Sequence, residues 1–311
     1  MTSWNNISLE GEDMKLAIMG LGKMGFNLMQ NALKQNHEVV SYDVNLKQVK
    51  QAEEKGAQGA ETIEEMIRHF DNQKIIWMMV PSGDITENLI TELTPLLGEG
   101  DILIDGGNSH YKDTVRRYSK LAEKGISYVD VGTSGGMEGA LAGACTMIGG
   151  DRLVFEKLEP LFKDLSVENG YLYTGESGSG HFLKMIHNGI EYGMMQSISE
   201  GFDILEKSPY DFDHEKVARV WNHGSVIRSW LMELMESAFS EDPKLDQIRG
   251  VVQASGEGKW TVETAMELET AAPVIALSLM MRNRSLETDS FSGKVVASLR
   301  NQFGGHAVEK Q

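Results

Sequence analysis

Residues 15–43 contain the pattern that most restricts the fold of this chain. A short apolar segment at 15–19 leads into a glycine-rich turn at 20–25, a helical pattern follows, and a second apolar segment at 37–42 ends in Asp43. Glycines at this spacing permit a tight turn and let a pyrophosphate approach the N-terminus of the next helix. The motif G-x-G-x-x-G alone is weak evidence for dinucleotide binding, but the strand-like segments on both sides make it specific. The pattern therefore predicts a βαβ unit that binds a dinucleotide.

Asp43 indicates which dinucleotide is preferred. Its carboxylate can accept hydrogen bonds from ribose hydroxyls, and it would repel a 2′-phosphate. Two unit charges about 4 Å apart interact by roughly 4 kcal/mol at an effective dielectric constant of 20. No Arg follows, because the next residues are Val44, Asn45 and Leu46. We expect NAD to be preferred over NADP, and Asp43 can at the same time serve as the N-cap of the following helix.

Apolar segments and helical patterns continue to alternate up to about residue 178. The segments are continuously apolar, which is typical of buried parallel strands, and ligands bind at the carboxyl ends of such strands. The turns at 81–83 and 107–109 are therefore candidate ligand sites. Strands are expected at 74–80, 101–105, 144–148 and 170–174, with helices at 82–97, 111–124 and 151–164. The expected cofactor contacts are Gly20, Leu21, Gly22, Lys23, Met24, Gly25, Asp43, Val80, Pro81 and Asn108.

A glycine-rich segment follows the apolar segment at 128–131. Four glycines fall within residues 132–139, and a strand-like run begins at 144. A flexible linker is one interpretation. The strand directly after the segment favours an ordered loop within a sheet, whose free N–H groups suit a carboxylate.

The second half of the chain lacks strand patterns. Helical patterns lie at about 180–207, 213–223, 226–239, 257–269, 273–283 and 291–302. We therefore expect a Rossmann-type doubly wound α/β domain over 14–178 and an all-α domain over 179–311. Residues 1–13 are polar and without periodicity, so we interpret them as a flexible N-terminal extension outside the fold.

Composition excludes several classes of function. The net charge is −17, which argues against binding to nucleic acid or an anionic membrane, and no apolar run is long enough to span a bilayer. Cys145 is the one cysteine, which fits a reducing cytoplasm, and no signal peptide is visible. The eight histidines show no metal-ligand spacing, so we expect no metal.

Lys184, His187, Asn188 and Glu191 stand at i, i+3, i+4 and i+7. On a helix this spacing places a base, two hydrogen-bonding groups and an acid on one face. A solvated surface stripe is the alternative interpretation. Basic residues further along, namely Lys259, Arg282, Arg284 and the tail residues from Arg300 to His306, can each be surface charges or can together attract an anionic substrate.

Six motifs together resemble the 6-phosphogluconate dehydrogenase family, in particular its short bacterial NAD-preferring members. KMIHNGIEYG is the most specific, because related β-hydroxyacid dehydrogenases usually have Asn where His187 stands and lack the Glu191 acid. NADP-using relatives carry Asn and Arg where this chain has Asp43 and Val44. The motifs are GLGKMG (20–25), GGNS (106–109), SGGMEGA (134–140), KMIHNGIEYG (184–193), GKWT (258–261) and RNQFGGH (300–306).

The resemblance implies oxidative decarboxylation of 6-phosphogluconate to ribulose 5-phosphate in the pentose phosphate pathway. It makes Lys184 the general base and Glu191 the acid. Arg300 and His306 would reach the site of a partner subunit in a homodimer or homotetramer. The sugar acid would be held by Asn108, Ser134, Gly135, Gly136, His187 and Asn188. The phosphate would be held by Tyr192, Lys259, Thr261 and Arg284.

Two other functions are compatible with parts of this sequence. One is a non-decarboxylating β-hydroxyacid dehydrogenase such as 3-hydroxyisobutyrate dehydrogenase, against which Glu191, Lys259 and Arg284 argue. The other is a non-catalytic NAD-binding sensor or scaffold. The presence of both Lys184 and Glu191 argues against it, because binding alone needs no acid–base pair.

Overall fold

An eight-stranded sheet forms the centre of the first half of the protein, seen here in a computed structural model that describes residues 13–304. The strand order is β3-β2-β1-β4-β5-β6-β7-β8. The strands from β1 to β6 are parallel, whereas β7 pairs antiparallel with β6 and parallel with β8. The bounds are β1 Lys15–Met19, β2 Glu38–Tyr42, β3 Gln58–Ala60, β4 Ile75–Met78, β5 Ile102–Asp105, β6 Ser127–Ser134, β7 Ala144–Gly149 and β8 Ser166–Gly175.

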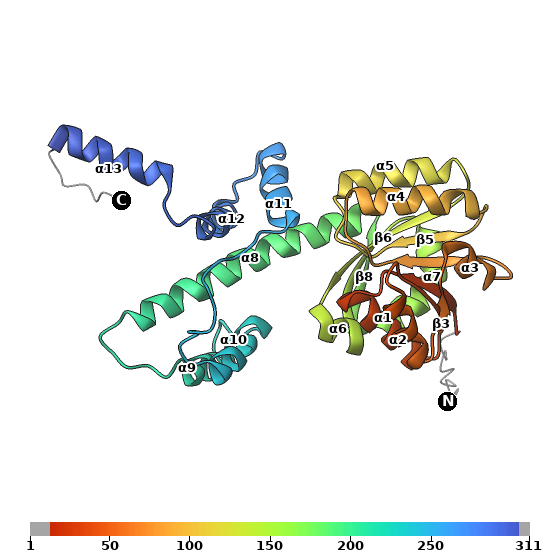
Figure 1. Cartoon of the computed structure of the whole chain (residues 1–311), viewed down its shortest axis with the longest axis horizontal. Helices are drawn as coiled ribbons and strands as arrows, with labels where there is room; N and C mark the ends of the chain where they lie inside the picture. The colour runs from red at the N-terminus through yellow and green to blue at the C-terminus, as the bar shows by residue number, and fades with distance from the viewer. Residues whose placement is uncertain (1–12, 305–311) are drawn as a thin grey trace, which may run out of the picture. The chain divides into compact units, whose positions relative to one another are not determined.

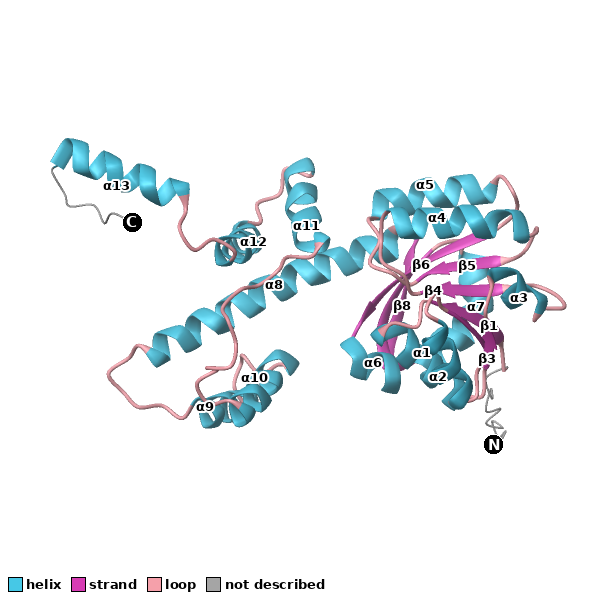
Figure 2. Ribbon diagram, in the orientation of Figure 1, coloured by secondary structure: helices cyan, strands magenta, loops and turns pink. Residues whose placement is uncertain are grey.

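Helices cover both faces of this sheet, with α1 and α2 on one face and α4 and α5 on the other (Figure 2). Successive residues of β1 alternate between two apolar cores: Leu16 and Ile18 belong to one, Ala17 and Met19 to the other. Burial on both faces explains why the strands are continuously apolar. The helices are α1 Lys23–Lys34, α2 Leu46–Glu54, α3 Ile63–Arg68, α4 Asp84–Leu93, η1 Thr94–Leu96, α5 Tyr111–Ala122, α6 Gly136–Ala142 and α7 Arg152–Leu165.

Contacts divide the chain into two compact units, Met1–His187 and Asn188–Gln311, each shown with its own elements in Figure 1. The boundary falls inside α8, Ser179–Glu206. The second unit is helical, and Phe202, Met232 and Phe239 are buried in its core. Among the described residues, no helix is both long and apolar enough to cross a membrane. The other helices are α9 His214–Asn222, α10 Trp230–Glu241, α11 Gly256–Glu267, α12 Pro273–Ser285 and α13 Phe291–Gly304.

The expected fold class, a doubly wound α/β domain followed by a helical domain, is confirmed. Three details differ. Residues 136–142 form helix α6 and not the expected loop, because Gly135, with φ of +112°, begins the helix in a left-handed conformation. The sequence pattern predicts a helix after Asp43, which is α2, but it does not reveal β3 and α3; β3 is only three residues long and lies at the sheet edge. The N-cap of α2 is Asn45 and not Asp43, since the Asn45 side chain accepts a hydrogen bond from Lys47 N. The extension expected at 1–13 lies, apart from Asp13, outside the described residues.

His37, just before β2, makes the stability of the first unit depend on pH. Its Nδ1 accepts a hydrogen bond from Met14 N at 3.1 Å, and its Nε2 lies 3.4 Å from Asp164 Oδ2 without hydrogen-bond geometry. Burial lowers the pKa of His37 below its ordinary value of 6.5, and the charge of Asp164 only partly opposes this effect. The unfolded chain therefore takes up a proton at a higher pH than the folded chain.

We predict that this histidine makes no pH-dependent contribution well above pH 6.5 and that stability falls as the pH drops through 6.5. The slope from one proton is at most about 1.4 kcal/mol per pH unit. Urea unfolding at pH 8 and at pH 5.5 measures the difference. His37→Asn, which keeps an acceptor for Met14 N, should reduce the dependence in this window. An equal dependence in the variant would show that His37 is not its source.

Candidate active site

The glycine turn between β1 and α1 has the geometry of a nucleotide cradle. Gly20 has φ of +90°, and a Cβ atom there would lie 2.6 Å from the carbonyl oxygen of Met79. A Cβ atom on Gly25 would lie 1.9 Å from the carbonyl oxygen of Gly20. Gly22 differs, because its Cβ position has no heavy atom within 4 Å. The first and third glycines are thus required by backbone packing, and the second leaves the open space that a pyrophosphate needs.

Asp43 ties this turn to the end of β2. Its Oδ2 accepts a hydrogen bond from Leu21 N at 2.6 Å, and its Oδ1 accepts one from Asn45 N at 2.7 Å. The neighbouring Val44 is exposed and brings no positive charge. The carboxylate therefore lies beside the turn with a fixed orientation. The turn itself follows β1, next to the point between β1 and β4 where the strand order reverses, and ligands bind at such points.

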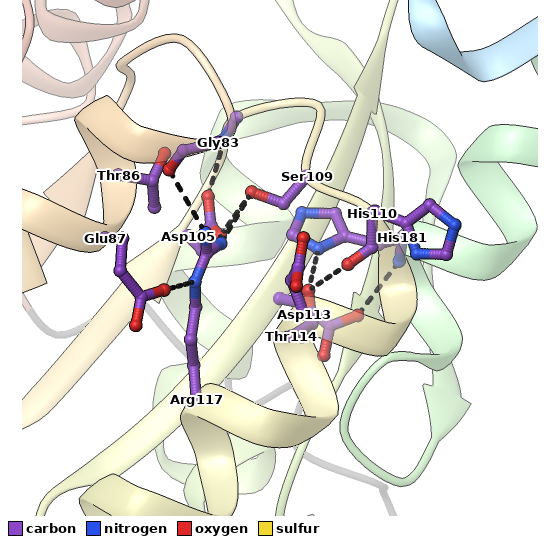
Figure 3. A network of polar contacts seen from close by, with 12 residues as sticks. Gly83, Thr86, Glu87, Asp105, Ser109, His110, Asp113, Thr114, Arg117 and His181 are labelled. Carbon is purple, nitrogen blue, oxygen red and sulfur yellow. Dashed lines mark hydrogen bonds and ion pairs between the residues drawn. The ribbon is translucent and has the colours of Figure 1, made fainter. Parts of the chain in front are cut away.

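A buried carboxylate, Asp105, holds the turn after β5 (Figure 3). Its Oδ2 accepts hydrogen bonds from the hydroxyls of Ser109 and Tyr128, both at 2.7 Å, and its Oδ1 accepts one from Gly107 N at 3.1 Å. Burial and the nearby Asp105 charge raise the pKa of Tyr128 well above its ordinary value, so Tyr128 stays a donor. These bonds fix both sides of Asn108, whose side chain is exposed.

Arg117 connects this turn to the turn after β4. Its side chain is buried, with Nη1 3.4 Å from Asp105 Oδ2 and 3.1 Å from Ser109 Oγ (Figure 3). Its Nη2 donates to the carbonyl of Gly83 at 3.4 Å, and its Nε donates to Glu87 Oε2 at 3.0 Å. Hydrogen bonds from Arg116, and then from Arg117, lower the pKa of Glu87 to about 2. One arginine thus orders the two turns that carry Val80, Pro81 and Asn108.

Another buried carboxylate, Asp130 of β6, holds the start of α8. Its Oδ1 accepts from Gly178 N at 2.7 Å and its Oδ2 accepts from His181 N at 2.9 Å. The first backbone N–H groups of a helix have no partner within the helix, so an anion there satisfies both their hydrogen bonds and the helix dipole. The His181 ring is held too, since its Nδ1 lies 2.8 Å from Thr114 Oγ1.

Glycines then allow α8 to lie directly against the sheet. A Cβ atom on Gly132 of β6 would lie 2.3 Å from Lys184 Cβ, and one on Gly180 would lie 2.4 Å from the carbonyl oxygen of Met147. Lys184 is consequently only 7% exposed. The surface interpretation of the polar stripe is therefore wrong for Lys184.

Lys184, His187 and Ser134 form a continuous polar chain. Lys184 Nζ lies 3.4 Å from His187 Nδ1, and His187 Nε2 lies 3.1 Å from Ser134 Oγ. A neutral imidazole has one donor and one acceptor nitrogen. When Lys184 is protonated, Nδ1 accepts from it and Nε2 donates to Ser134. Gly135 and Gly136 follow with φ of +112° and +60°, so the backbone turns sharply into α6 beside this chain.

In the second unit, α8 packs closely against α11. A Cβ atom on Gly189 would lie 2.6 Å from Thr261 Cγ2, and Thr261 is buried with its hydroxyl donating to the Glu257 carbonyl at 2.8 Å. Tyr192 is 3% exposed. Asn188 is buried and Glu191 is half-buried, so the stripe on this part of α8 is not fully solvated.

The predicted cationic residues are more dispersed. Lys259 is exposed, with Nζ 3.5 Å from Glu263 Oε1, and Arg284 is exposed, with Nη1 3.4 Å from Glu287 Oε2. Within residues 13–304, no polar contact joins either of them to Tyr192. Arg300 is exposed on α13, and His306 lies outside the described residues.

Asp105, Arg117 and Asp130 were not identified from the sequence as parts of the site. For the two aspartates the signal was an acid inside or at the end of an apolar strand, since a charge is seldom buried without a partner. Arg117, in helix α5, carries no such signal. In the part of the chain that the structure describes, no group of three or more His, Cys, Asp or Glu side chains is placed to hold a metal ion.

The sheet, its glycine turn and the buried lysine on the following helix define an α/β dinucleotide-binding protein of the dehydrogenase class. Residues 15–175 match the NAD binding domain of 6-phosphogluconate dehydrogenase, and residues 180–302 match the C-terminal domain of 6-phosphogluconate dehydrogenase. The chain belongs to the 6-phosphogluconate dehydrogenase family, which confirms the resemblance found in the sequence.

Relatives support this assignment over nearly the whole chain. A Bacillus subtilis protein provisionally named as a 6-phosphogluconate dehydrogenase is 61% identical, over 96% of this chain and 100% of its own. A Haloferax volcanii protein, named as an NAD-dependent, decarboxylating 6-phosphogluconate dehydrogenase, is 40% identical over 96% of this chain and 99% of its own. The solved structure of Plasmodium falciparum 6-phosphogluconate dehydrogenase is similar with a TM-score of 0.80 and 29% identity, covering 96% of this chain and 66% of that one.

The close contact at Gly132 leads to a prediction. In Gly132→Ala, the added methyl group would overlap Lys184 Cβ, which cannot swing away because it is bonded directly to the helix backbone. We expect a loss of roughly 1–3 kcal/mol in the free energy of unfolding and a larger proportional loss of turnover. Gly98→Ala is the control, because the nearest atom to its Cβ position is 4.0 Å away. Denaturant unfolding and steady-state rates measure both effects; a Gly132→Ala protein with wild-type stability and activity would contradict the packing.

Proposed function

We propose that this protein oxidises and decarboxylates 6-phosphogluconate to ribulose 5-phosphate and carbon dioxide, with NAD as the electron acceptor. The observation that carries the proposal is the buried Lys184, held against β6 by Gly132 and linked through His187 to Ser134. Family membership and the Haloferax volcanii relative support the same reaction. In this proposal residues 14–178 bind the cofactor and residues 179–311 bind the substrate and a partner subunit.

The residues that would hold NAD fit a dinucleotide. Gly22 leaves the space for the pyrophosphate, and Asp43 lies where a ribose hydroxyl can donate to a carboxylate. When bound, NAD supplies the acceptor for the hydride from C3 of the sugar acid. The proposed contacts are Gly20, Leu21, Gly22, Lys23, Met24, Gly25, Asp43, Val80, Pro81 and Asn108.

Lys184 has the part of general base for the 3-hydroxyl proton. An ordinary lysine is protonated at pH 7.4, and making it neutral requires about 4 kcal/mol. Burial disfavours an ammonium and so lowers this requirement. After the oxidation the lysine carries the proton, and its ammonium stabilises the negative charge that develops on the C3 oxygen as the carboxylate leaves as carbon dioxide. No separate electron sink is needed.

Glu191 then donates a proton to C1 of the enediol, which gives ribulose 5-phosphate. Its position, seven residues after Lys184 on the same helix, places it on the face that carries the base. We propose that the sugar acid contacts Asn108, Ser134, Gly135, Gly136, His187 and Asn188. We propose that the phosphate contacts Tyr192, Lys259, Thr261 and Arg284, with Arg300 and His306 supplied by a partner in a homodimer or homotetramer.

The non-decarboxylating β-hydroxyacid dehydrogenases are the second candidate. Such an enzyme needs the lysine but no acid for C1, so Glu191 favours the decarboxylating reaction. The two candidates differ in one product, because only the decarboxylating enzyme releases carbon dioxide.

We predict that 6-phosphogluconate and NAD yield reduced cofactor and carbon dioxide in equal amounts. Initial rates that follow both products test this reaction. Lys184→Ala should lower the rate by about 100- to 10,000-fold, the usual size of general acid–base catalysis, while calorimetry still detects NAD binding. Lys124→Ala, at an exposed lysine in the turn after α5, is the matched control. Reduced cofactor without carbon dioxide would favour the second candidate, and an active Lys184→Ala protein would refute the role of the base.

We predict that Asp43 determines the preference for NAD. In Asp43→Asn the amide oxygen can still accept from Leu21 N, but the charge that repels a 2′-phosphate is gone. If about half of the roughly 4 kcal/mol repulsion acts in the protein, the ratio of kcat/KM for NAD to that for NADP should fall at least tenfold. Glu123→Gln removes one exposed negative charge elsewhere and should leave the ratio unchanged. An unaltered ratio in Asp43→Asn would exclude charge repulsion as the cause.

A further inference from the structure

His181, in the first turn of α8, is a buried histidine that the proposed mechanism does not use. Only 2% of its surface is exposed, and it lies three residues before Lys184 on the same helix. Its Nδ1 lies 2.8 Å from Thr114 Oγ1 on α5, whereas its Nε2 is buried without a hydrogen-bond partner among residues 13–304. Buried polar groups are normally satisfied, so the contact with Thr114 is the interaction that fixes this ring.

The Thr114 hydroxyl determines the direction of the bond between the two side chains. Thr114 Oγ1 donates to the carbonyl oxygen of His110 at 3.4 Å, so its hydrogen is already used. A neutral imidazole has one donor and one acceptor nitrogen, and Nδ1 of His181 is then the donor. A continuous path of hydrogen bonds thus runs from the ring of His181 through Thr114 to the backbone of His110 (Figure 3).

Apolar packing around this path holds the first turn of α5 against the first turn of α8. The rings of Tyr111 and Phe182 meet edge to face, with centroids 5.0 Å apart. A Cβ atom on Gly178 would lie 2.8 Å from Val115 Cγ2 and 3.2 Å from the carbonyl oxygen of Tyr111. The hydrogen bond to Thr114 lies within this contact, and it restricts direction in a way that apolar packing does not.

The first turn of α5 is continuous with the backbone that carries Asn108. His110 is the N-cap of α5, and the hydroxyl of Ser109, the residue before it, donates to Asp105 of β5. The turn is therefore tied to the sheet through Asp105 and to α8 through the path that ends at His181. The same helix α8 carries the proposed base, so this path connects the two sides of the candidate active site directly.

We infer that His181 is a positioning residue, which sets the distance between Asn108 and Lys184 through its bond to Thr114. The inference rests on the proposed function, in which Asn108 contacts the cofactor and the sugar acid and Lys184 takes the proton of the 3-hydroxyl. Hydride transfer requires aligned reactants, and a misplacement of about 1 Å can lower a rate roughly 100-fold. The role needs no contact between His181 and either reactant, because the effect passes through the backbone of the two first turns.

Single-turnover formation of reduced cofactor in Thr114→Val tests this inference. Valine keeps the branched shape of threonine and removes the acceptor for the His181 hydrogen. We expect the hydride step and kcat to fall about 10- to 100-fold. NAD affinity measured by calorimetry should be unchanged, because the glycine turn and Asp43 are untouched.

Thr146→Val on β7 is the matched control. Thr146 is buried, and its hydroxyl lies 2.8 Å from Ser166 Oγ, the same distance as in the bond between Thr114 and His181. Thr146 is not among the proposed cofactor or substrate contacts. This control should lose a similar amount of stability in denaturant unfolding but keep the wild-type hydride step, which separates a positioning effect from a general loss of stability.

Two variants of the histidine separate the hydrogen bond from the bulk of the ring. His181→Asn places an amide N–H close to the position of Nδ1 and should keep most of the rate. His181→Leu keeps an apolar side chain of similar size without a donor and should be as slow as Thr114→Val. The double variant His181→Leu/Thr114→Val should be no slower than either single variant, since both changes remove the same bond.

Three results would overturn the inference: a wild-type hydride step in Thr114→Val, an equal loss in Thr146→Val, or His181→Asn as slow as His181→Leu. If His181→Leu does not fold, Thr114→Val still decides, because it removes the bond from the other side. Failure of the proposed function has a different signature. The wild type would then not turn over 6-phosphogluconate with NAD, and the inference would fall with it, whereas failure of the inference alone leaves wild-type turnover intact.

Discussion

The placement of the catalytic candidates depends on the buried carboxylate of Asp130. It accepts hydrogen bonds from Gly178 N and His181 N and so fixes the first turn of α8 to strand β6. A buried carboxylate is unfavourable unless its oxygens are bonded, and helix N-terminal amides are unfavourable unless they find an acceptor. The carboxylate of Asp130 and the N-terminal amides of α8 thus satisfy each other's need for a hydrogen-bond partner. Lys184, one turn further along α8, is thereby held against Gly132, and this contact is why a lysine that would otherwise be solvated is buried.

A similar arrangement orders the nucleotide-facing edge of the sheet. Asp105 and Arg117 are buried together, and their remaining hydrogen bonds go to the backbone and hydroxyl groups of the turns after β4 and β5. Paired burial of opposite charges contributes little net stability, but it penalises any other arrangement of the loops. The glycine turn needs no such clamp, because steric exclusion at Gly20 and Gly25 already restricts its backbone. Steric exclusion thus restricts the backbone of the glycine turn, and buried charges restrict the turns after β4 and β5.

The strong negative charge of the chain limits how the protein can attract an anionic substrate. A chain of net charge −17 repels a phosphorylated sugar acid at long range, so recognition has to come from cations at contact distance. Lys259 pairs with Glu263 and Arg284 pairs with Glu287, and exposed pairs of this kind contribute little to stability. Arg282 is held instead by the face of Tyr192, which contributes orientation without neutralising charge.

Four features follow from the sequence alone: the α/β class, the helical second half, the glycine turn and the polar stripe of α8. Strand burial, the tight turn and helical spacing are all set by residues close in the chain. The elements that the sequence did not reveal are β3 and α3, which are three and six residues long and carry little pattern, and α6, which depends on a left-handed glycine at its start. Only the tertiary structure decided which polar residues are buried. Asp130 meets His181, and Arg117 meets Gly83, across long stretches of chain, and Arg282 rather than Arg284 faces Tyr192 because α12 packs with one face inward. Sequence spacing specifies which residues share a face, but packing determines which face is turned toward the site.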